Sequence, residues 1–201
     1  MSNTAIILAA GNGTRMKADK SKLLLEINGM TVIERTVKTF SKISDIDDII
    51  VVVRESDIPL YEKVLSGYDI SYCIGGSTRQ ESVSNAVETI DSCDMIIIHD
   101  GARPLVTEKE ILNTLRSAEK YGAAATGVPV KDTIKVIDDN NKIVDTPKRS
   151  SLIAIQTPQI FTFNKYVEAY LATAEMIDST ERTLKYSNMA LQILDRYQVE
   201  L

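Results

Sequence analysis

The sequence predicts an α/β fold: a three-layer sandwich with a mainly parallel central sheet and a protruding β-hairpin arm. Short apolar runs rich in Ile and Val recur along the chain, separated by segments of helical length, which is typical of parallel sheets. Runs such as IIVVV and MIIIH are continuously apolar, as strands covered by helices on both faces require. At 201 residues the chain is expected to form one domain, residues 1–201, with a single large core.

Five strands are expected from the apolar runs. In chain order they are Ala5–Ala9, Asp48–Val53, Ile70–Ile74, Met95–His99 and Ala123–Val130. Two of the helices between them are marked by capping boxes, in which a Ser or Thr stands about three residues before a Glu or Gln. Thr107 and Glu110 begin one helix, which ends at Gly122. Ser77 and Gln80 begin another, directly after a pair of glycines.

Residues 131–156 follow a different pattern and predict the hairpin arm. The sequence DTIKVI, a polar DDNN turn and a second extended stretch leave the main sheet with little core of their own. Because an isolated hairpin is only marginally stable in water, we expect a second copy of the chain to cover the arm in a homodimer.

Composition narrows the possible partners. A net charge of -5 argues against nonspecific binding to nucleic acid or to an anionic membrane, since both need a basic surface. The N-terminus lacks a basic signal-peptide region, and no segment approaches about eighteen apolar residues. We therefore expect a cytoplasmic protein that spans no membrane. Cys73 and Cys93 lack CxxC spacing and a neighbouring histidine, which predicts reduced thiols in the core.

The strongest functional signal is the stretch LAAGNGTRM, which directly follows the first expected strand. Gly11 and Gly13 permit a tight turn, and Arg15 and Lys22 are two of four nearby cations. Backbone amides and clustered cations bind phosphate chains, so we expect this loop to hold a triphosphate, with a solvated basic loop as the alternative. A dinucleotide-binding fingerprint does not fit, because Met16 stands where a third glycine would pack the helix.

A second motif, IHDGARP, lies at the carboxyl end of the fourth expected strand, where open α/β sheets bind ligands. Asp100 is suited to hold Mg²⁺, which favours one or two carboxylates together with phosphate oxygens. The alternative is a cap or a structural ion pair with Arg103. His99 is the only histidine and ends an apolar strand, which favours a hydrogen-bonded structural role over general-base catalysis.

Taken together and in order, these motifs resemble the 2-C-methyl-D-erythritol 4-phosphate cytidylyltransferases of the non-mevalonate isoprenoid pathway. The motifs are LAAGNGTRM with Lys22, GGSTRQESV, HDGARP, PVKDTIK, and KRSSL followed by QTPQ. The resemblance implies a Rossmann-like fold of the nucleotide-diphospho-sugar transferase type. It also implies a cytidylyltransferase that transfers CMP from CTP to methylerythritol phosphate, with release of pyrophosphate and with Mg²⁺ as cofactor.

The resemblance implies roles for individual residues. Arg15 and Lys22 would be catalytic, stabilising charge on the α-phosphate, and Asp100 would hold Mg²⁺. The nucleotide would be bound by Ala9, Ala10, Gly11, Gly13, Gly76 and Ser82, and the acceptor by Arg103, Thr133, Arg149 and Thr157. Thr133 and Arg149 would reach the partner's active site from the arm, whereas Thr157 lies in the QTPQ turn.

Other functions stay open at this point. A ribitol 5-phosphate or other polyol-phosphate cytidylyltransferase would share the nucleotide motifs and differ in the arm, where Arg149 favours methylerythritol phosphate. The family's Asn-Ile-Lys segment and final helix have no counterpart between Asp195 and Leu201, which leaves a truncated or inactive nucleotide-binding homologue as an alternative. The structural alternative is an ordinary basic loop on an α/β scaffold.

Overall fold

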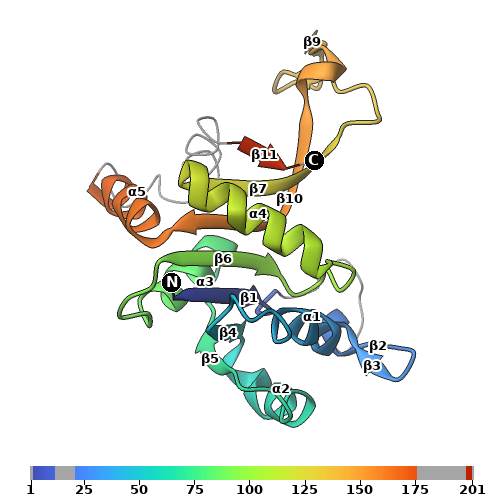
Figure 1. The fold of residues 1–201 in the computed structure, drawn as a ribbon. Coiled ribbons are helices and arrows are strands. Elements are labelled where there is room, and N and C mark those ends of the chain that lie inside the picture. Colours follow the sequence, from blue (N-terminus) through green and yellow to red (C-terminus); the bar gives the residue numbers. More distant parts are fainter. Residues whose placement is uncertain (1, 12–20, 176–197, 201) are drawn as a thin grey trace.

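The computed structural model describes residues 2–11, 21–175 and 198–200. Within these ranges the chain forms a seven-stranded sheet with strand order β11-β7-β10-β6-β1-β4-β5 (Figure 1). The strands are β1 Asn3–Leu8, β4 Asp48–Val53, β5 Ser71–Ile74, β6 Met95–Asp100, β7 Ala123–Pro129, β10 Ile153–Thr162 and β11 Gln198–Glu200. All neighbours pair in parallel except β10, which runs antiparallel to both β6 and β7. The predicted mainly parallel sheet is confirmed.

Helices cover both faces of the sheet. Successive residues of a strand point to opposite faces, so neighbouring apolar residues of one strand pack against different helices. Ala5 and Ile7 of β1 are buried in one apolar cluster with residues of α1, α2 and α4. Ile6 is buried in a second cluster, on the other face, with residues of α3 and α5. The helices are α1 Val32–Phe40, α2 Ile58–Val64, α3 Arg79–Val87, α4 Glu108–Tyr121 and α5 Phe163–Glu175. The three-layer sandwich is therefore confirmed.

Of the two predicted capping boxes, the one that begins α4 is confirmed and the one that begins α3 is corrected. Thr107 caps α4 and forms the predicted box with Glu110, and Gly122 ends the helix with φ 87°. The box of α3 lies one residue later than predicted: Thr78, not Ser77, is the cap, and its partner is Glu81, not Gln80. Glu81 can close the box because its carboxylate accepts the backbone N–H groups of both Ser77 and Thr78.

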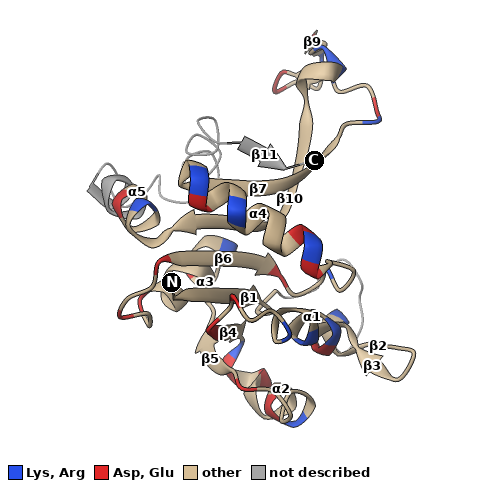
Figure 2. Cartoon of the chain, in the orientation of Figure 1, with Lys and Arg blue, Asp and Glu red and all other residues tan. Residues whose placement is uncertain are grey.

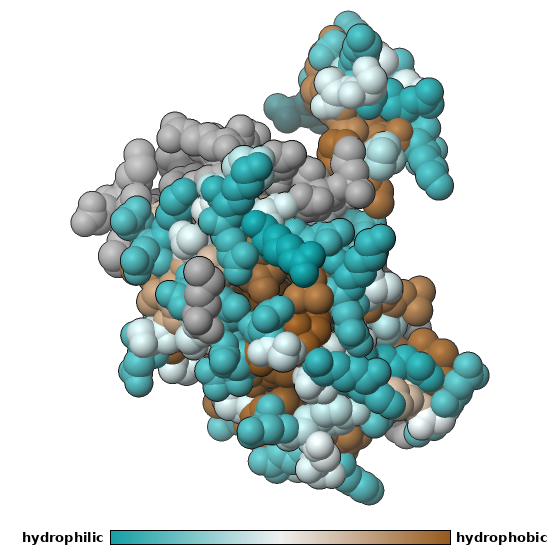
Figure 3. Space-filling model, viewed as in Figure 1, coloured by the Kyte–Doolittle hydropathy of each residue, from teal (hydrophilic) through white to brown (hydrophobic). Residues whose placement is uncertain are grey.

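The arm predicted at residues 131–156 is a hairpin that projects from the body of the molecule (Figure 1). Its strands are β8 Val136–Ile137 and β9 Ile143–Asp145, which pair antiparallel. A 3₁₀ helix at Arg149–Ser151 then leads into β10, whose first residues pair with β7 in the main sheet. Ile137, Ile143 and Val144 are all more than half exposed, and brown hydrophobic residues are visible on the arm in Figure 3.

The remaining short elements lie near the N-terminal third of the chain. They are a small hairpin, β2 Glu26–Ile27 with β3 Met30–Thr31, and 3₁₀ helices at Lys22–Leu24 and Glu55–Asp57. No helix in the described ranges is both long and apolar enough to cross a membrane.

Candidate active site

Two of the predicted motifs, LAAGNGTRM and HDGARP, meet at the carboxyl edge of the sheet. β1 lies between β4 and β6, and its last residue, Leu8, pairs with Asp100 at the end of β6. The Gly101 amide donates to the Leu8 carbonyl at 2.9 Å, and the Ala9 amide donates to the Val52 carbonyl at 2.7 Å. The chain therefore leaves β1 next to the HDGARP motif, at the edge where open α/β sheets bind ligands.

Asp100 is held between two arginines. Its Oδ1 accepts from Nε and Nη2 of Arg79 at 3.3 and 3.2 Å, and its Oδ2 accepts from Nε of Arg103 at 3.1 Å. Burial alone would raise the pKa of Asp100, but the two guanidinium groups outweigh it and hold that pKa below its usual value. Asp100 is thus an ionised carboxylate in a basic setting, and the ion pair with Arg103 considered from the sequence is present.

This carboxylate fits Mg²⁺ only together with a bound phosphate chain. The described residues hold no cluster of three or more His, Cys, Asp or Glu side chains that would bind a metal by themselves. Magnesium commonly uses one or two carboxylates and takes its other ligands from phosphate and water, and a single ionised Asp meets that requirement. The two arginines would then be free to contact phosphate oxygens, which guanidinium groups bind well.

Arg79 is a site residue that sequence reasoning missed. It opens α3, where the positive end of the helix dipole disfavours a cation. That unfavourable position was the available signal, because a nearby anion offsets the repulsion between a cation and the helix dipole. In the structure the partner is Asp100, which is 21 residues away in the sequence.

His99 has the predicted structural role. Its side chain is fully buried, its Nδ1 lies 3.1 Å from the Thr157 hydroxyl, and its Nε2 lies 3.2 Å from the Arg103 carbonyl. Burial lowers the pKa of His99 to about 4, so the ring is neutral. Since a carbonyl only accepts, Nε2 carries the proton and Nδ1 accepts from Thr157. His99 therefore ties β10 to the turn that carries Arg103.

Thr157 lies in the sheet and not in a turn, which corrects the sequence reading of QTPQ. Strand β10 runs through this motif with a register shift between Ile155 and Gln159, and the Thr157–Pro158 peptide is cis. The local irregularity explains why Pro158 is compatible with the strand. It also brings the buried Thr157 hydroxyl to the Asp100 amide, which donates to it at 3.2 Å.

The predicted nucleotide-binding residues Ala9, Ala10, Gly76 and Ser82 are close together. A Cβ on Gly75 would lie 2.5 Å from Cβ of Ala10 and 2.9 Å from Oγ of Ser82, so glycine is needed for this close approach. The Ser82 hydroxyl accepts from the Gly76 amide at 3.1 Å and donates to the Thr78 carbonyl at 2.9 Å. Ser82 thus shapes the turn between β5 and α3.

Two of the predicted phosphate-binding residues, Gly13 and Arg15, lie outside the described residues. Gly11 is described and exposed, with open space where a Cβ would be. Lys22 begins the 3₁₀ helix that follows the glycine-rich segment, and its side chain is partly exposed.

The predicted arm residues lie apart from this cluster. Thr133 and Arg149 are exposed, and the Arg149 guanidinium donates to the Lys131 carbonyl at 3.0 Å. Basic positions are visible on the arm in Figure 2. Within the described ranges, no hydrogen bond or ion pair joins either residue to Asp100 in the same chain.

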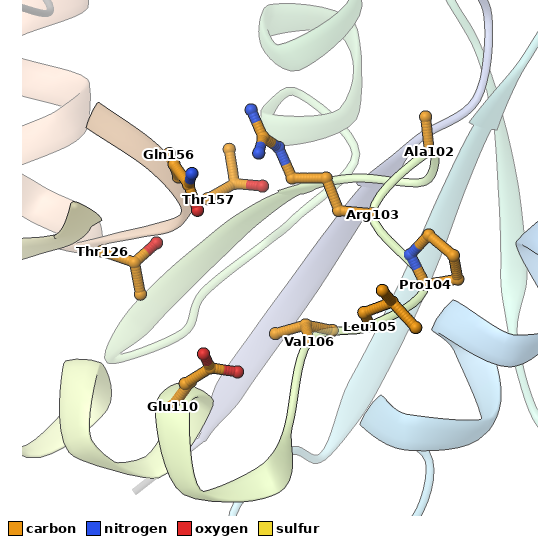
Figure 4. Close-up of a pocket in the computed structure, with 9 residues that line it drawn as sticks. All are labelled: Ala102, Arg103, Pro104, Leu105, Val106, Glu110, Thr126, Gln156 and Thr157. Atoms are coloured by element: carbon orange, nitrogen blue, oxygen red, sulfur yellow. The ribbon is translucent and has the colours of Figure 1, made fainter. Parts of the chain in front are cut away.

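A cavity of about 360 Å³ opens beside Arg103 and Thr157 (Figure 4). It is lined by Ala102, Arg103, Pro104, Leu105, Val106, Glu110, Thr126, Gln156 and Thr157. Its walls combine apolar surface with the Arg103 guanidinium group, hydroxyls, an amide and the Glu110 carboxylate, which accepts from the Thr107 amide and hydroxyl. A small polar molecule suits such walls, with any negative charge at the Arg103 end.

Comparison with known proteins gives one consistent result. Residues 3–190 match the family model described as 2-C-methyl-D-erythritol 4-phosphate cytidylyltransferase. A protein of that name from Clostridium perfringens is 45% identical over 164 residues, which cover 80% of this chain and 73% of the relative. A second, from Bacillus mycoides, is 42% identical over 171 residues, or 83% of this chain and 75% of the relative.

Solved structures agree with the sequence matches. A 4-diphosphocytidyl-2C-methyl-D-erythritol synthase from Anaerococcus prevotii superimposes with a TM-score of 0.80 at 32% identity, covering 98% of this chain and 85% of the other. A 2-C-methyl-D-erythritol 4-phosphate cytidylyltransferase from Thermus thermophilus gives a TM-score of 0.72 at 27% identity, covering 100% and 88%.

Proposed function

The chain belongs to the 2-C-methyl-D-erythritol 4-phosphate cytidylyltransferase family, and we propose that it transfers CMP from CTP to 2-C-methyl-D-erythritol 4-phosphate. The products are the CDP-linked methylerythritol, an isoprenoid precursor, and pyrophosphate. The structural observation that carries the proposal is Asp100, ionised between Arg79 and Arg103 at the edge where β1 leads into the glycine-rich segment. This arrangement suits a phosphate chain and a metal ion together.

The reaction is an in-line displacement at phosphorus. A phosphate oxygen of the acceptor forms a bond to the α-phosphorus of CTP, and the bond between that phosphorus and the bridging oxygen to the β-phosphate breaks. Because the acceptor phosphate is already ionised at neutral pH, no side chain has to remove a proton. The neutral, fully hydrogen-bonded His99 agrees with that requirement, since it is committed to Thr157 and Arg103.

The chain's own contribution is to orient the phosphates and to stabilise negative charge. Lys22 and Arg15 act on the α-phosphate, where charge accumulates during the displacement. Arg79 is available to the phosphate chain from the first turn of α3. The nucleotide lies along Ala9 to Gly13 and contacts the turn at Gly76 and Ser82, where the close packing of Gly75 against Ala10 supports a narrow base-binding site.

Asp100 holds the Mg²⁺ ion in this proposal. When bound, Mg²⁺ neutralises charge on the phosphates and fixes their orientation relative to the incoming oxygen. The low pKa of Asp100 supports this role, since the carboxylate is ionised before the ion arrives.

The acceptor occupies the cavity beside Arg103 and Thr157, whose polar and apolar walls suit a phosphorylated polyol. Thr133 and Arg149 complete that site from the arm of a second copy. The support is that the arm projects from its own body and exposes apolar residues such as Ile143 and Val144, which a partner would cover. The working form is therefore a homodimer.

We place the enzyme in the cytoplasm, where nucleoside triphosphates are found. Cys73 and Cys93 are both free thiols, as a reducing compartment favours. The net charge of -5 supports small phosphorylated substrates over nucleic acid or membrane partners.

The test of the assignment is the choice of acceptor. Purified protein is incubated with CTP and Mg²⁺ and either methylerythritol 4-phosphate or ribitol 5-phosphate, and products are followed by phosphorus NMR. A new diphosphate diester is expected with methylerythritol 4-phosphate only. Product with ribitol 5-phosphate instead would reassign the acceptor, and no product with either would refute the proposed activity.

A further inference from the structure

Tyr61 is a fully buried tyrosine on α2 whose ring belongs to the apolar cluster beneath β1. Its hydroxyl lies 3.4 Å from the Ala9 carbonyl and 3.5 Å from the Ser21 hydroxyl. Ala9 lies two residues before Gly11, the first glycine of the motif, and Ser21 immediately precedes Lys22. One buried phenol, from an element about 40 to 50 residues further along the chain, therefore contacts both ends of the segment that carries the phosphate-binding residues.

The three polar groups have a single consistent hydrogen-bond direction. The Ala9 carbonyl can only accept, so the Tyr61 hydroxyl donates to it. The Ser21 hydroxyl accepts from the Leu23 amide at 3.4 Å, and its own proton is left for the Tyr61 oxygen. Each hydroxyl thus accepts once and donates once. The chain of bonds runs from the Leu23 amide to the Ala9 carbonyl.

This chain fixes the two residues that flank the segment. The Ala9 amide already donates to the Val52 carbonyl, so with Tyr61 on its carbonyl both backbone groups of Ala9 are occupied. On the other side, Ser21 caps the 3₁₀ helix that begins at Lys22. Holding Ser21 therefore sets the position at which the Lys22 backbone starts.

The position of Tyr61 is itself supported by the residues that begin α2. Arg54, which follows β4, forms an ion pair with the largely buried Asp57 at 2.6 Å, and Asp57 ends the 3₁₀ turn that leads into α2. Pro59 then occupies the first turn of α2, where its fixed φ suits a helix start. Tyr61 follows two residues later, and burial raises the pKa of its hydroxyl, which stays protonated as a donor.

We propose that Tyr61 is a positioning residue for CTP, a clasp that joins Ala9 to Ser21 and so sets Ala9 and Lys22 for the triphosphate. The inference rests on the proposed function for its kinetic consequence, but the clasp itself is a property of the free protein. The long distances indicate weak individual bonds, so its loss should weaken nucleotide use without unfolding the protein.

The first experiment removes one oxygen atom. Tyr61→Phe keeps the ring in the core and deletes the hydroxyl. Tyr68→Phe is the control, because Tyr68 packs on the same apolar cluster and its hydroxyl interacts with Glu34, with no hydrogen bond to Ala9 or Ser21 among the described residues. Tyr61→Phe is expected to raise the KM for CTP about fivefold and to leave the KM for the acceptor unchanged, whereas Tyr68→Phe changes neither.

The second experiment asks whether Tyr61 and Ser21 act as one unit. Ser21→Ala should raise the KM for CTP by a similar factor. In the double variant the KM for CTP should be about fivefold above that of the native chain, not about 25-fold. Amide hydrogen exchange in the nucleotide-free protein supplies a readout that needs no turnover. The Leu23 amide, whose acceptor is the Ser21 hydroxyl, and its neighbours at residues 21–24 should exchange faster in Tyr61→Phe, while the amides of α3 and α4 are unchanged.

The outcomes of these two experiments either support the Tyr61 clasp or overturn it. Faster exchange at residues 21–24 with a KM effect confined to CTP supports the clasp. Exchange and kinetics indistinguishable from those of Tyr68→Phe, or additive effects in the double variant, would overturn it. If the native chain shows no turnover, the proposed function fails, and the exchange experiment alone then tests the clasp.

Discussion

Nη2 of Arg79 lies 3.2 Å from Oδ1 of Asp100, which joins the first turn of α3 to the carboxyl end of β6. A cation at the start of a helix opposes the helix dipole, so the position is unfavourable without an anion nearby. We therefore propose that this edge of the sheet holds anions, first the carboxylate and then, with substrate bound, a phosphate chain.

Replacing Arg79 by Ala should lower kcat/KM for CTP roughly tenfold to a hundredfold, because one charged contact to the phosphates is lost. Arg116→Ala is the matched control, since Arg116 is exposed on α4. Steady-state kinetics at fixed acceptor concentration measure the effect. An Arg79→Ala enzyme as active as the Arg116→Ala enzyme would exclude Arg79 from the site.

Gly75→Ala should damage both stability and nucleotide binding. The added methyl group would meet Cβ of Ala10 at 2.5 Å and Oγ of Ser82 at 2.9 Å, and relieving this overlap should cost about 2 kcal/mol in the free energy of unfolding. Gly67→Ala is the control, because nothing lies within 4 Å of its added Cβ. Urea denaturation compares the two variants, and equal stability would show that the β5–α3 turn tolerates the methyl group.

The free energy of unfolding should decrease as the pH is lowered through the range in which His99 affects stability. Burial lowers its folded pKa to about 4, so below its unfolded value of about 6.5 the unfolded chain binds a proton that the folded chain does not. The free energy of unfolding should therefore drop by about 1 kcal/mol between pH 7 and pH 5.5. As His99 is the only histidine, His99→Gln should flatten this slope. An unchanged slope in that variant would contradict the neutral buried ring.

If Arg149 acts on the partner's active site, two inactive variants should rescue each other. In a mixture of Lys22→Ala and Arg149→Ala chains, half of the dimers are mixed, and each mixed dimer has one intact site. Pyrophosphate release should then recover to about a quarter of the native rate after subunit exchange. No recovery, with mixed dimers verified by mass spectrometry, would place Arg149 in its own chain's site or outside any site.

Much of the fold is visible in the sequence because it depends on local patterns. The continuous apolar runs predict strands covered on both faces, and those of β1, β4 and β6 occur within a residue or two of their expected bounds. The cap at Thr107 is confirmed because its partner Glu110 is fixed by helix geometry. The α3 cap is displaced by one residue because Ser77 and Thr78 are both acceptable caps, and Glu81 decides between them.

The site was less predictable where it depends on long-range pairing. The motifs identify Asp100 and Thr157, but only the antiparallel insertion of β10 beside β6 brings the Thr157 hydroxyl to the Asp100 amide. Arg79 was missed for the same reason, since its partner is in another element. Tyr61 gives no local signal at all, because a buried tyrosine on an apolar helix face reads as ordinary core.

The central claim is that the glycine-rich segment and Lys22 serve CMP transfer, and it is tested most directly by pyrophosphate release. Native protein and Lys22→Ala are each supplied with CTP, Mg²⁺ and methylerythritol 4-phosphate, with acceptor omitted as the blank. We expect release that requires the acceptor and that falls on the order of a hundredfold in Lys22→Ala without loss of folded structure. Equal release by the two proteins, or none by the native chain, would contradict the account.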